Sequence, residues 1–168
     1  MSMALHIPAG TEVDFVPLAE LQKPAVKFIS SYWLAQRGDR KLPSRGEIRP
    51  REVASVLPHM ALLKIEDGDF VYRVVGDAVV RAFAVPLQNR RVTEIARGSP
   101  VFGTALQAMF LGIAGNGEPL ALRGTVGRDF PEANFTDFEN VFLPLGEDHE
   151  TVDHILTAST YTMRPNFR

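Results

Sequence analysis

The histidines of this sequence are side chains that could bind a metal ion or a haem iron. His59 begins a predicted strand, and His154 lies inside another one, on the same face as Val152 and Leu156. Haem iron needs an axial ligand, which is usually a histidine. No two histidines have the spacing of a metal-binding pair, however. We therefore interpret His154 as a half-buried histidine bonded to a neighbour, with haem ligation as the alternative.

Carboxyl and phenol groups could supply acid–base chemistry. Asp137 and Glu139 share one face of a predicted strand, and Tyr72 or His154 could be their partner if the fold gathered them in a pocket. The two acids alternate with Phe138, which is the pattern of an amphipathic strand with one face in solvent. The solvent-facing interpretation is the simpler one, and catalysis is the alternative.

Basic residues are concentrated in one polar, turn-rich stretch, residues 37–51. Acids interrupt this stretch, and no aromatic residue lies within it, unlike in a surface that stacks on bases. We interpret it as a solvated connector, with an anionic partner as the alternative. The formal net charge of −2 also argues against nucleic acid as a partner. The basic residues are Arg37, Arg40, Lys41, Arg45, Arg49 and Arg51.

A single charge, Arg73, interrupts an otherwise apolar predicted strand. A charge in such a place needs a partner or lies on the outer face of the sheet. We expect a structural ion pair, and the alternative is that Arg73 orients an anionic ligand.

The composition limits the class of protein. The chain has 168 residues, which fits one domain with a sizeable core. It contains no cysteine, which excludes disulfides, thiolate metal sites and cysteine nucleophiles. No apolar run approaches the roughly 20 residues of a transmembrane helix, and the start of the chain lacks the pattern of a signal peptide. We expect a cytoplasmic protein without a membrane span.

Periodicity predicts an α+β domain in three segments. Residues 1–23 show no clear pattern and form a loosely held lead-in, residues 24–58 a helical cap and connector, and residues 59–163 the core. Helices are expected over 24–37, 50–58, 78–85 and 99–116, and five strands over 59–66, 69–75, 119–126, 135–144 and 151–161.

The strongest local signal is the pair Asp67-Gly68, which is typical of a two-residue type I′ turn. It predicts an antiparallel hairpin and hence an antiparallel sheet with helices over one face. Phe70, Tyr72 and Val74 are expected on one face of the second strand. In "YRVVGDAVVRAF", which begins within that strand, Asp77 is expected to cap the short helix that follows.

The order of these elements resembles the PAS fold, a five-stranded antiparallel sheet whose helices enclose a ligand-sized cavity. Three stretches together resemble a PAS-like family of alphaproteobacteria that was long described only as a domain of unknown function. They are "YWLAQRGDRKLPSRGEIRPREVASVLPHMALLKIE", "YRVVGDAVVRAF" and "LPLGEDHETVDHILTA". The resemblance covers roughly residues 25–161. It implies a sensory or interaction module, and it implies no common cofactor or reaction.

The resemblance also implies where a ligand would bind. Cysteine-dependent flavin and coumarate photochemistry are excluded, because the chain has no cysteine, and haem has little support, so the cofactor stays unknown. Arg73 and His154 are the candidates for polar ligand contacts. The candidate pocket residues, which could equally fill a closed core, are Val79, Val80, Phe83, Met109, Phe110, Leu122, Phe138 and Phe142.

A stand-alone PAS-like module must pass its signal to another protein, so we expect a protein partner besides any small-molecule ligand. The predicted helix 24–37, with Tyr32 next to Trp33, could form a homodimer, or it could pack on its own sheet with the same residues. The alternative function is a small-molecule enzyme on a cone-shaped fold of the ketosteroid isomerase type.

Overall fold

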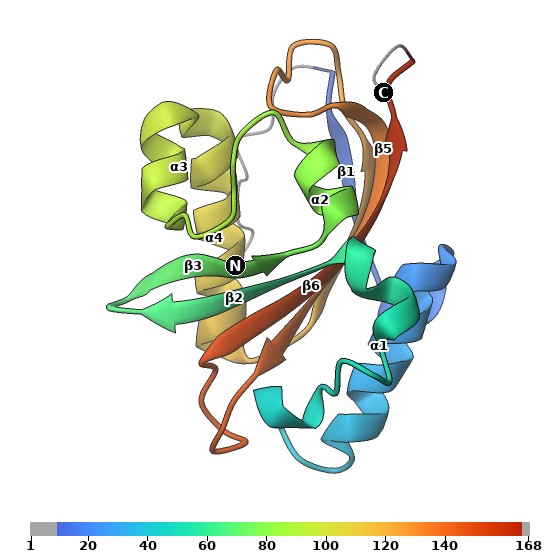
Figure 1. Ribbon diagram of the computed structural model, residues 1–168, viewed down its shortest axis with the longest axis vertical. Helices are drawn as coiled ribbons and strands as arrows, with labels where there is room; N and C mark the ends of the chain where they lie inside the picture. Colours follow the sequence, from blue (N-terminus) through green and yellow to red (C-terminus); the bar gives the residue numbers. More distant parts are fainter. Residues whose placement is uncertain (1–9, 166–168) are drawn as a thin grey trace.

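The computed structural model describes residues 10–165 of the chain (Figure 1). One antiparallel sheet forms the centre, with the strand order β1-β4-β5-β6-β2-β3. The strands are β1 (Glu12–Val16), β2 (Met60–Glu66), β3 (Asp69–Val75), β4 (Leu120–Thr125), β5 (Phe135–Leu145) and β6 (His154–Met163). The α-helices are α1 (Pro24–Arg37), α2 (Asp77–Ala82), α3 (Val92–Gly98) and α4 (Pro100–Asn116). Short 3₁₀ turns are η1 (Leu18–Glu20), η2 (Arg45–Glu47) and η3 (Ala54–His59).

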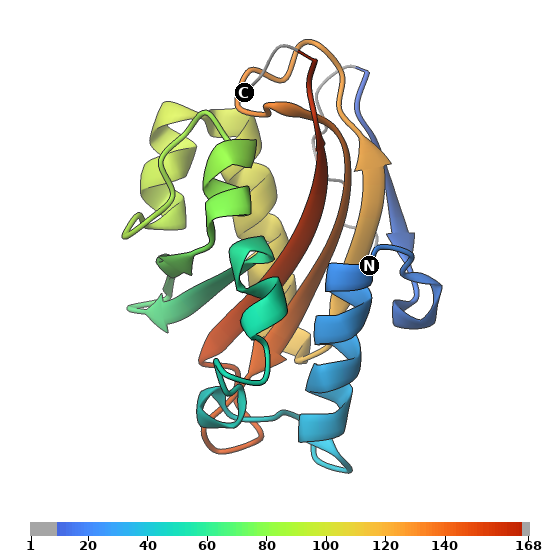
Figure 2. The same ribbon diagram turned by 45° about the vertical axis from the view of Figure 1, so that its right-hand side comes forward.

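The molecule has three layers, with the sheet in the middle. Helices α2, α3 and α4 cover one face, which we call the inner face, and α1 covers the outer face (Figure 2). Each face has its own apolar core. The inner core includes Leu63, Phe70 and Phe110, and the outer core includes Trp33 and Leu143. The α+β, PAS-like fold expected from the sequence is confirmed, with six strands instead of five.

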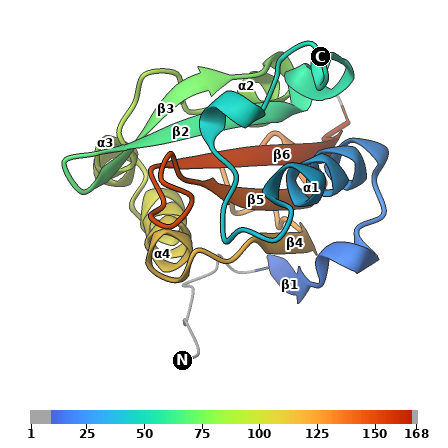
Figure 3. The same ribbon diagram turned by 90° about the horizontal axis from the view of Figure 1, so that it is seen from below.

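The sixth strand, β1, corrects the prediction for the lead-in. It pairs antiparallel with β4 at the edge of the sheet, with Val13 opposite Gly124 (Figure 3). The close approach needs the glycine, since a Cβ at Gly124 would lie 2.1 Å from the carbonyl oxygen of Glu12. Acids alternate with apolar residues in "EVDF", which is a weak strand signal, but the alternation breaks at the adjacent Phe15 and Val16.

The predicted turn and the ends of the two long helices agree with the structure, whereas the helix expected over 50–58 is the 3₁₀ turn η3 and the one expected over 78–85 already ends at Ala82. Asp67 and Gly68 both have positive φ, 53° and 74°, and they join β2 to β3. Helix α1 begins at Pro24, and α4 begins at Pro100 and ends before Gly117, whose φ of 69° is left-handed. The short helix α3 was missed, since its seven residues provide little periodicity.

A β-bulge changes which residues of β3 face the core. Leu62 pairs with Val74 and Leu63 with Tyr72, so Arg73 is the extra residue between two pairs. Phe70 and Tyr72 are buried against the helices as expected, but the bulge turns Val74 to the outside, where it is exposed. The simple alternation predicted for this strand is therefore wrong after Tyr72.

Helix α1 packs its apolar face against the outer face of its own sheet. Val26, Ile29 and Trp33 follow each other at helical spacing and are fully buried on the outer face of the sheet. The indole Nε1–H of Trp33 donates to the carbonyl oxygen of Pro144 at 2.9 Å. Phe28 points away and is 41% exposed. No helix of the described part of the chain has both the length and the apolar character to cross a bilayer.

Candidate ligand-binding cavity

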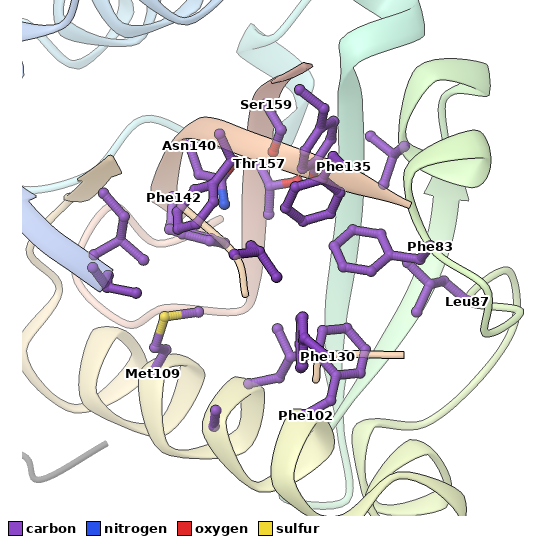
Figure 4. A pocket seen from close by; sticks show the side chains of 18 of the residues that line it. Phe83, Leu87, Phe102, Met109, Phe130, Phe135, Asn140, Phe142, Thr157 and Ser159 are labelled. Carbon is purple, nitrogen blue, oxygen red and sulfur yellow. The ribbon is translucent and has the colours of Figure 1, made fainter. Parts of the chain in front are cut away.

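A cavity of about 150 Å³ lies between the inner face of the sheet and helices α2 and α4 (Figure 4). Its lining is mostly aromatic and aliphatic, with a few hydroxyl and amide groups. The aromatic lining residues are Tyr72, Phe83, Phe102, Phe130, Phe135, Phe138, Phe142 and Tyr161. The aliphatic ones are Val13, Val79, Leu87, Val101, Ala105, Leu106, Met109, Leu122 and Val126, and the polar ones are Thr11, Asn140, Thr157 and Ser159.

Gly76 positions the first helix over the cavity. The chain leaves β3 at this residue and turns at once into α2, of which Gly76 is the N-cap. A Cβ here would lie 2.4 Å from the carbonyl oxygen of Pro58 and 2.5 Å from that of Leu57, so only glycine fits. The side chain of Asp77 makes no capping hydrogen bond, contrary to the prediction. Val79 and Phe83 then face the cavity.

Helix α4 forms the opposite wall. Phe102, Leu106 and Met109 recur at intervals of four and three residues, so one side of the helix faces the cavity. The predicted start at Ser99-Pro100 is correct, although the Ser99 side chain does not cap the helix. Gly103 lets α4 pack closely on α3, because a Cβ there would lie 2.3 Å from the Cα of Ala96.

Packed aromatic rings form one end of the cavity. Phe83 stacks on Phe102 with their ring centroids 5.1 Å apart, and it meets Phe135 edge-on at 5.4 Å. Phe135 in turn packs on Tyr161 at 4.5 Å. The loop between β4 and β5 brings Phe130 onto Phe102, and this loop is hydrogen-bonded to the end of α2 through Ala84 and Glu132. Such ring pairs stabilise beyond the area that they bury.

A polar strip crosses the sheet side of the cavity. Asn140 of β5 lies directly opposite Ser159 of β6 in the register, and Thr157 lies two residues further along β6 on the same face (Figure 4). The Oδ1 atom of Asn140 is buried and has no hydrogen-bond partner. Burial raises the pKa of both Tyr72 and Tyr161, so both phenols stay protonated and neutral.

Most of the predicted pocket residues line this cavity, namely Val79, Phe83, Met109, Leu122, Phe138 and Phe142. Two of the predicted residues do not. Val80 lies on the outward side of α2 and is 53% exposed, because one helical step of about 100° separates it from Val79. Phe110 is fully buried in the solid core beside the cavity, with its ring 5.5 Å from that of Phe70.

Neither predicted polar contact residue lies at the cavity. Arg73 is exposed at the bulge of β3, where its guanidinium donates to the Glu66 carboxylate at 2.6 Å. His154 stands at the start of β6, and its Nδ1–H donates to the neighbouring Asp153 carboxylate at 2.8 Å. His59 is also bound elsewhere, since its Nδ1–H donates to the carbonyl oxygen of Ser159 at 3.1 Å.

The acids considered for catalysis lie on the outer face of the sheet, away from Tyr72. Asp137 is exposed, as expected of a solvent-facing strand. For Glu139 that interpretation is wrong, because its side chain is only 2% exposed. Its Oε2 accepts from Arg123 at 2.9 Å, and its Oε1 accepts from the backbone N–H groups that precede α1. The fold therefore does not gather the predicted acid–base group.

The polar strip was missed by sequence reasoning, although a signal for it exists. In "TASTY" the hydroxyl-bearing Thr157, Ser159 and Tyr161 stand at alternate positions of a strand. Alternation puts all three on one face, and the pairing of β6 with β5 makes that face the inner one. Only the register shows that Asn140 completes the strip.

Two residues of the basic connector make local ion pairs. Arg40 pairs with Glu47 at 2.5 Å and contacts the ring of His149 in the acidic turn before β6. Arg49 pairs with Glu52 at 3.2 Å. The guanidinium of Arg37 lies over the Trp33 ring, 5.0 Å from its centroid. These contacts agree with a solvated connector that is fastened to the sheet.

The sequence was also compared with known families and proteins. The family model described as PAS domain matches residues 21–159, from the approach to α1 into β6. The match leaves out β1, so the strand that was not predicted is also the one outside the shared region. Comparison with curated proteins and with solved structures gave no match. With this span of the chain covered, and with the sheet and helices arranged as described, the chain belongs to the PAS domain family.

Proposed function

We propose that this chain is a PAS-type sensory module that binds a small, largely apolar molecule in the cavity between the sheet and α4. The observation that carries the proposal is the cavity itself, about 150 Å³ of space lined mainly by aromatic and aliphatic side chains. Protein interiors are normally close-packed, and apolar space of this size with a few polar groups beside it is typical of a site that binds a small molecule.

The proposal is for binding without chemical conversion. The acids considered for acid–base chemistry face the other side of the sheet, and His154 is bonded to Asp153 outside the cavity. The alternative of an enzyme of the ketosteroid isomerase type would need those groups beside Tyr72. The polar groups that face the cavity include the amide of Asn140 and the hydroxyls of Thr157 and Ser159, which can orient a bound molecule through hydrogen bonds.

A pair of matched substitutions on α4 tests the cavity. Leu106 lines it, whereas Leu111 is 52% exposed on the same helix and does not. Leu106→Trp fills the space and should abolish the binding of toluene, measured by titration calorimetry or by NMR shifts. Leu111→Trp should leave that binding unchanged. Wild-type protein that does not bind toluene, or equal loss in both variants, contradicts the proposal.

We also propose that the signal leaves through another protein, and that a second copy of the chain can be that partner through α1. Trp33 is used inside the chain, so the dimer would use the outward side of the helix, where Phe28 borders a shallow groove with Pro24 and Tyr32. Light scattering at micromolar concentration should then show a dimer that Phe28→Glu dissociates and Leu111→Glu does not. A strict monomer contradicts this proposal.

A further inference from the structure

Asn140 contributes an unsatisfied acceptor to an otherwise apolar cavity. Its Oδ1 atom is buried, and no donor from the described residues reaches it. Buried polar atoms in folded proteins are nearly always hydrogen-bonded, and one without a partner has lost its water without compensation. The side chain belongs to the cavity lining, and a rotation of its amide group would present Oδ1 to a ligand that supplies the missing donor (Figure 4).

The neighbours of Asn140 are groups that both donate and accept. Ser159 lies directly opposite on β6, and Thr157 is the next residue of that strand on the same face. Each carries a hydroxyl, which can rotate to donate to an oxygen in the cavity. A ligand hydroxyl beside this strip could donate to Asn140 and accept from one of these two residues.

The lining also limits charge and size. Among the described residues that line the cavity there is no aspartate, glutamate, lysine, arginine or histidine, so a charged ligand would have no counter-charge. A cavity of about 150 Å³ holds a molecule the size of benzene. The rings of Phe83, Phe102 and Phe135 offer edges and faces to an aromatic ligand.

We propose that the cavity selects a neutral phenol with a single ring, and that Asn140 is the residue that recognises its hydroxyl through a hydrogen bond to Oδ1. The inference rests on the proposed function, because it names the ligand class of the same cavity. It adds a specificity-determining residue and excludes carboxylates, phosphates and nucleotides as ligands.

The test compares phenol with toluene, in which a methyl group replaces the hydroxyl, and with benzoate, which is charged. Titration calorimetry of the wild-type protein should show phenol binding at least as tightly as toluene, and benzoate not binding. In Asn140→Leu, the ratio of phenol affinity to toluene affinity should fall about tenfold, because the acceptor is lost while the volume is kept. Thr160→Val is the matched control. It removes another buried, unpartnered oxygen, on a residue of β6 that pairs with Glu139 and is outside the cavity lining.

The outcomes separate this inference from the proposed function. If neither toluene nor phenol binds, the ligand cavity and the phenol inference both fail. If toluene binds but Asn140→Leu leaves the ratio unchanged, or if benzoate binds most tightly, the cavity stands and the phenol inference is overturned. Should Asn140→Leu not fold, the Asn140 side-chain amide NMR signals of the wild type provide the test. Both ligands bring a ring near Asn140, so the difference between them is the measurement. Phenol should shift these signals more than toluene does, and an equal or smaller shift with phenol contradicts the inference.

Discussion

The Oε1 atom of Glu139 on β5 accepts a hydrogen bond at 2.7 Å from the backbone N–H of Lys23, the residue that caps α1. The same oxygen accepts from the backbone N–H of Gln22 at 2.8 Å, and Oε2 accepts from Arg123. The next residue of the strand, Asn140, faces the cavity. One strand thus has a contact to α1 on its outer side and a potential ligand contact on its inner side.

Replacing Glu139 should release the start of α1. Glu139→Gln keeps the shape of the side chain but replaces the carboxylate by a neutral amide. The N–H groups of Gln22, Lys23 and Arg123 then lose a charged acceptor, so we expect the free energy of unfolding to fall by about 2 kcal/mol. Hydrogen exchange should increase most in the first turn of α1. Asp137→Asn is the control, since Asp137 is an exposed acid on the same face. Equal effects of the two substitutions on unfolding, measured in urea, would show that the contact to α1 is unimportant.

Acid should destabilise the protein through carboxyl groups whose pKa the fold lowers, among them Glu47 and Glu139. Arg40 and the backbone N–H of Ser44 lower the pKa of Glu47 from an ordinary 4.5 to about 2. Burial raises the pKa of Glu139, but the N–H groups of Lys23 and Gln22 together with Arg123 outweigh burial and lower it overall. A carboxyl whose pKa is lower in the folded state stabilises above its unfolded pKa, and that contribution is lost as the pH falls through the folded pKa.

The free energy of unfolding should therefore decrease as the pH falls from about 4.5 to about 2, as measured by urea titration at several pH values. Glu47→Gln should make this decrease shallower. Glu118→Gln, at an exposed residue without an ion pair among those found in the described chain, should leave it unchanged. A stability that does not change over this pH range contradicts the prediction.

Gly76 should tolerate no side chain. Gly76→Ala forces a Cβ against two backbone carbonyl oxygens, at 2.4 and 2.5 Å, and we expect a loss of about 3 kcal/mol in unfolding free energy. The matched change is Gly98→Ala, where nothing lies within 4 Å of the added atom, and it should change stability by less than about 1 kcal/mol. Thermal melting of both variants measures the difference, and a stable Gly76→Ala protein would be incompatible with this β3–α2 junction.

Arg73 should matter little for stability or for binding. Arg73 is exposed, and its partner Glu66 has two other cations within ion-pair distance. The Glu66 carboxylate lies 3.5 Å from the ammonium nitrogen of Lys64 and 3.7 Å from a guanidinium nitrogen of Arg91. Arg73→Gln should therefore change the unfolding free energy by about 0.5 kcal/mol or less and leave toluene and phenol affinities as they were. A loss of ligand affinity in this variant would support the earlier hypothesis that Arg73 orients a ligand.

Local chemistry made several elements predictable. Asp67-Gly68 requires positive φ at two successive residues, Pro24 and Pro100 begin helices, and Gly117 ends one, all of which depend on residues close together in the chain. The apolar side of α4 was predictable for the same reason, because helical spacing alone places Phe102, Leu106 and Met109 together. These signals, with the order of the motifs, were sufficient for the family.

Tertiary pairing decided what local signals could not. Glu139 and Asp137 have the same place in the alternation of β5, and only the docking of α1 buries one and leaves the other exposed. The bulge at Arg73 depends on the pairing of β3 with β2, so no pattern within β3 predicts it. The sequence by itself determined the α+β, PAS-like class of fold, the apolar helix wall and the family, but not the strand β1 or the helix α3. The register between β5 and β6 brought Asn140 beside Ser159, because hydrogen bonding between strands, and not proximity in the chain, sets which side chains meet.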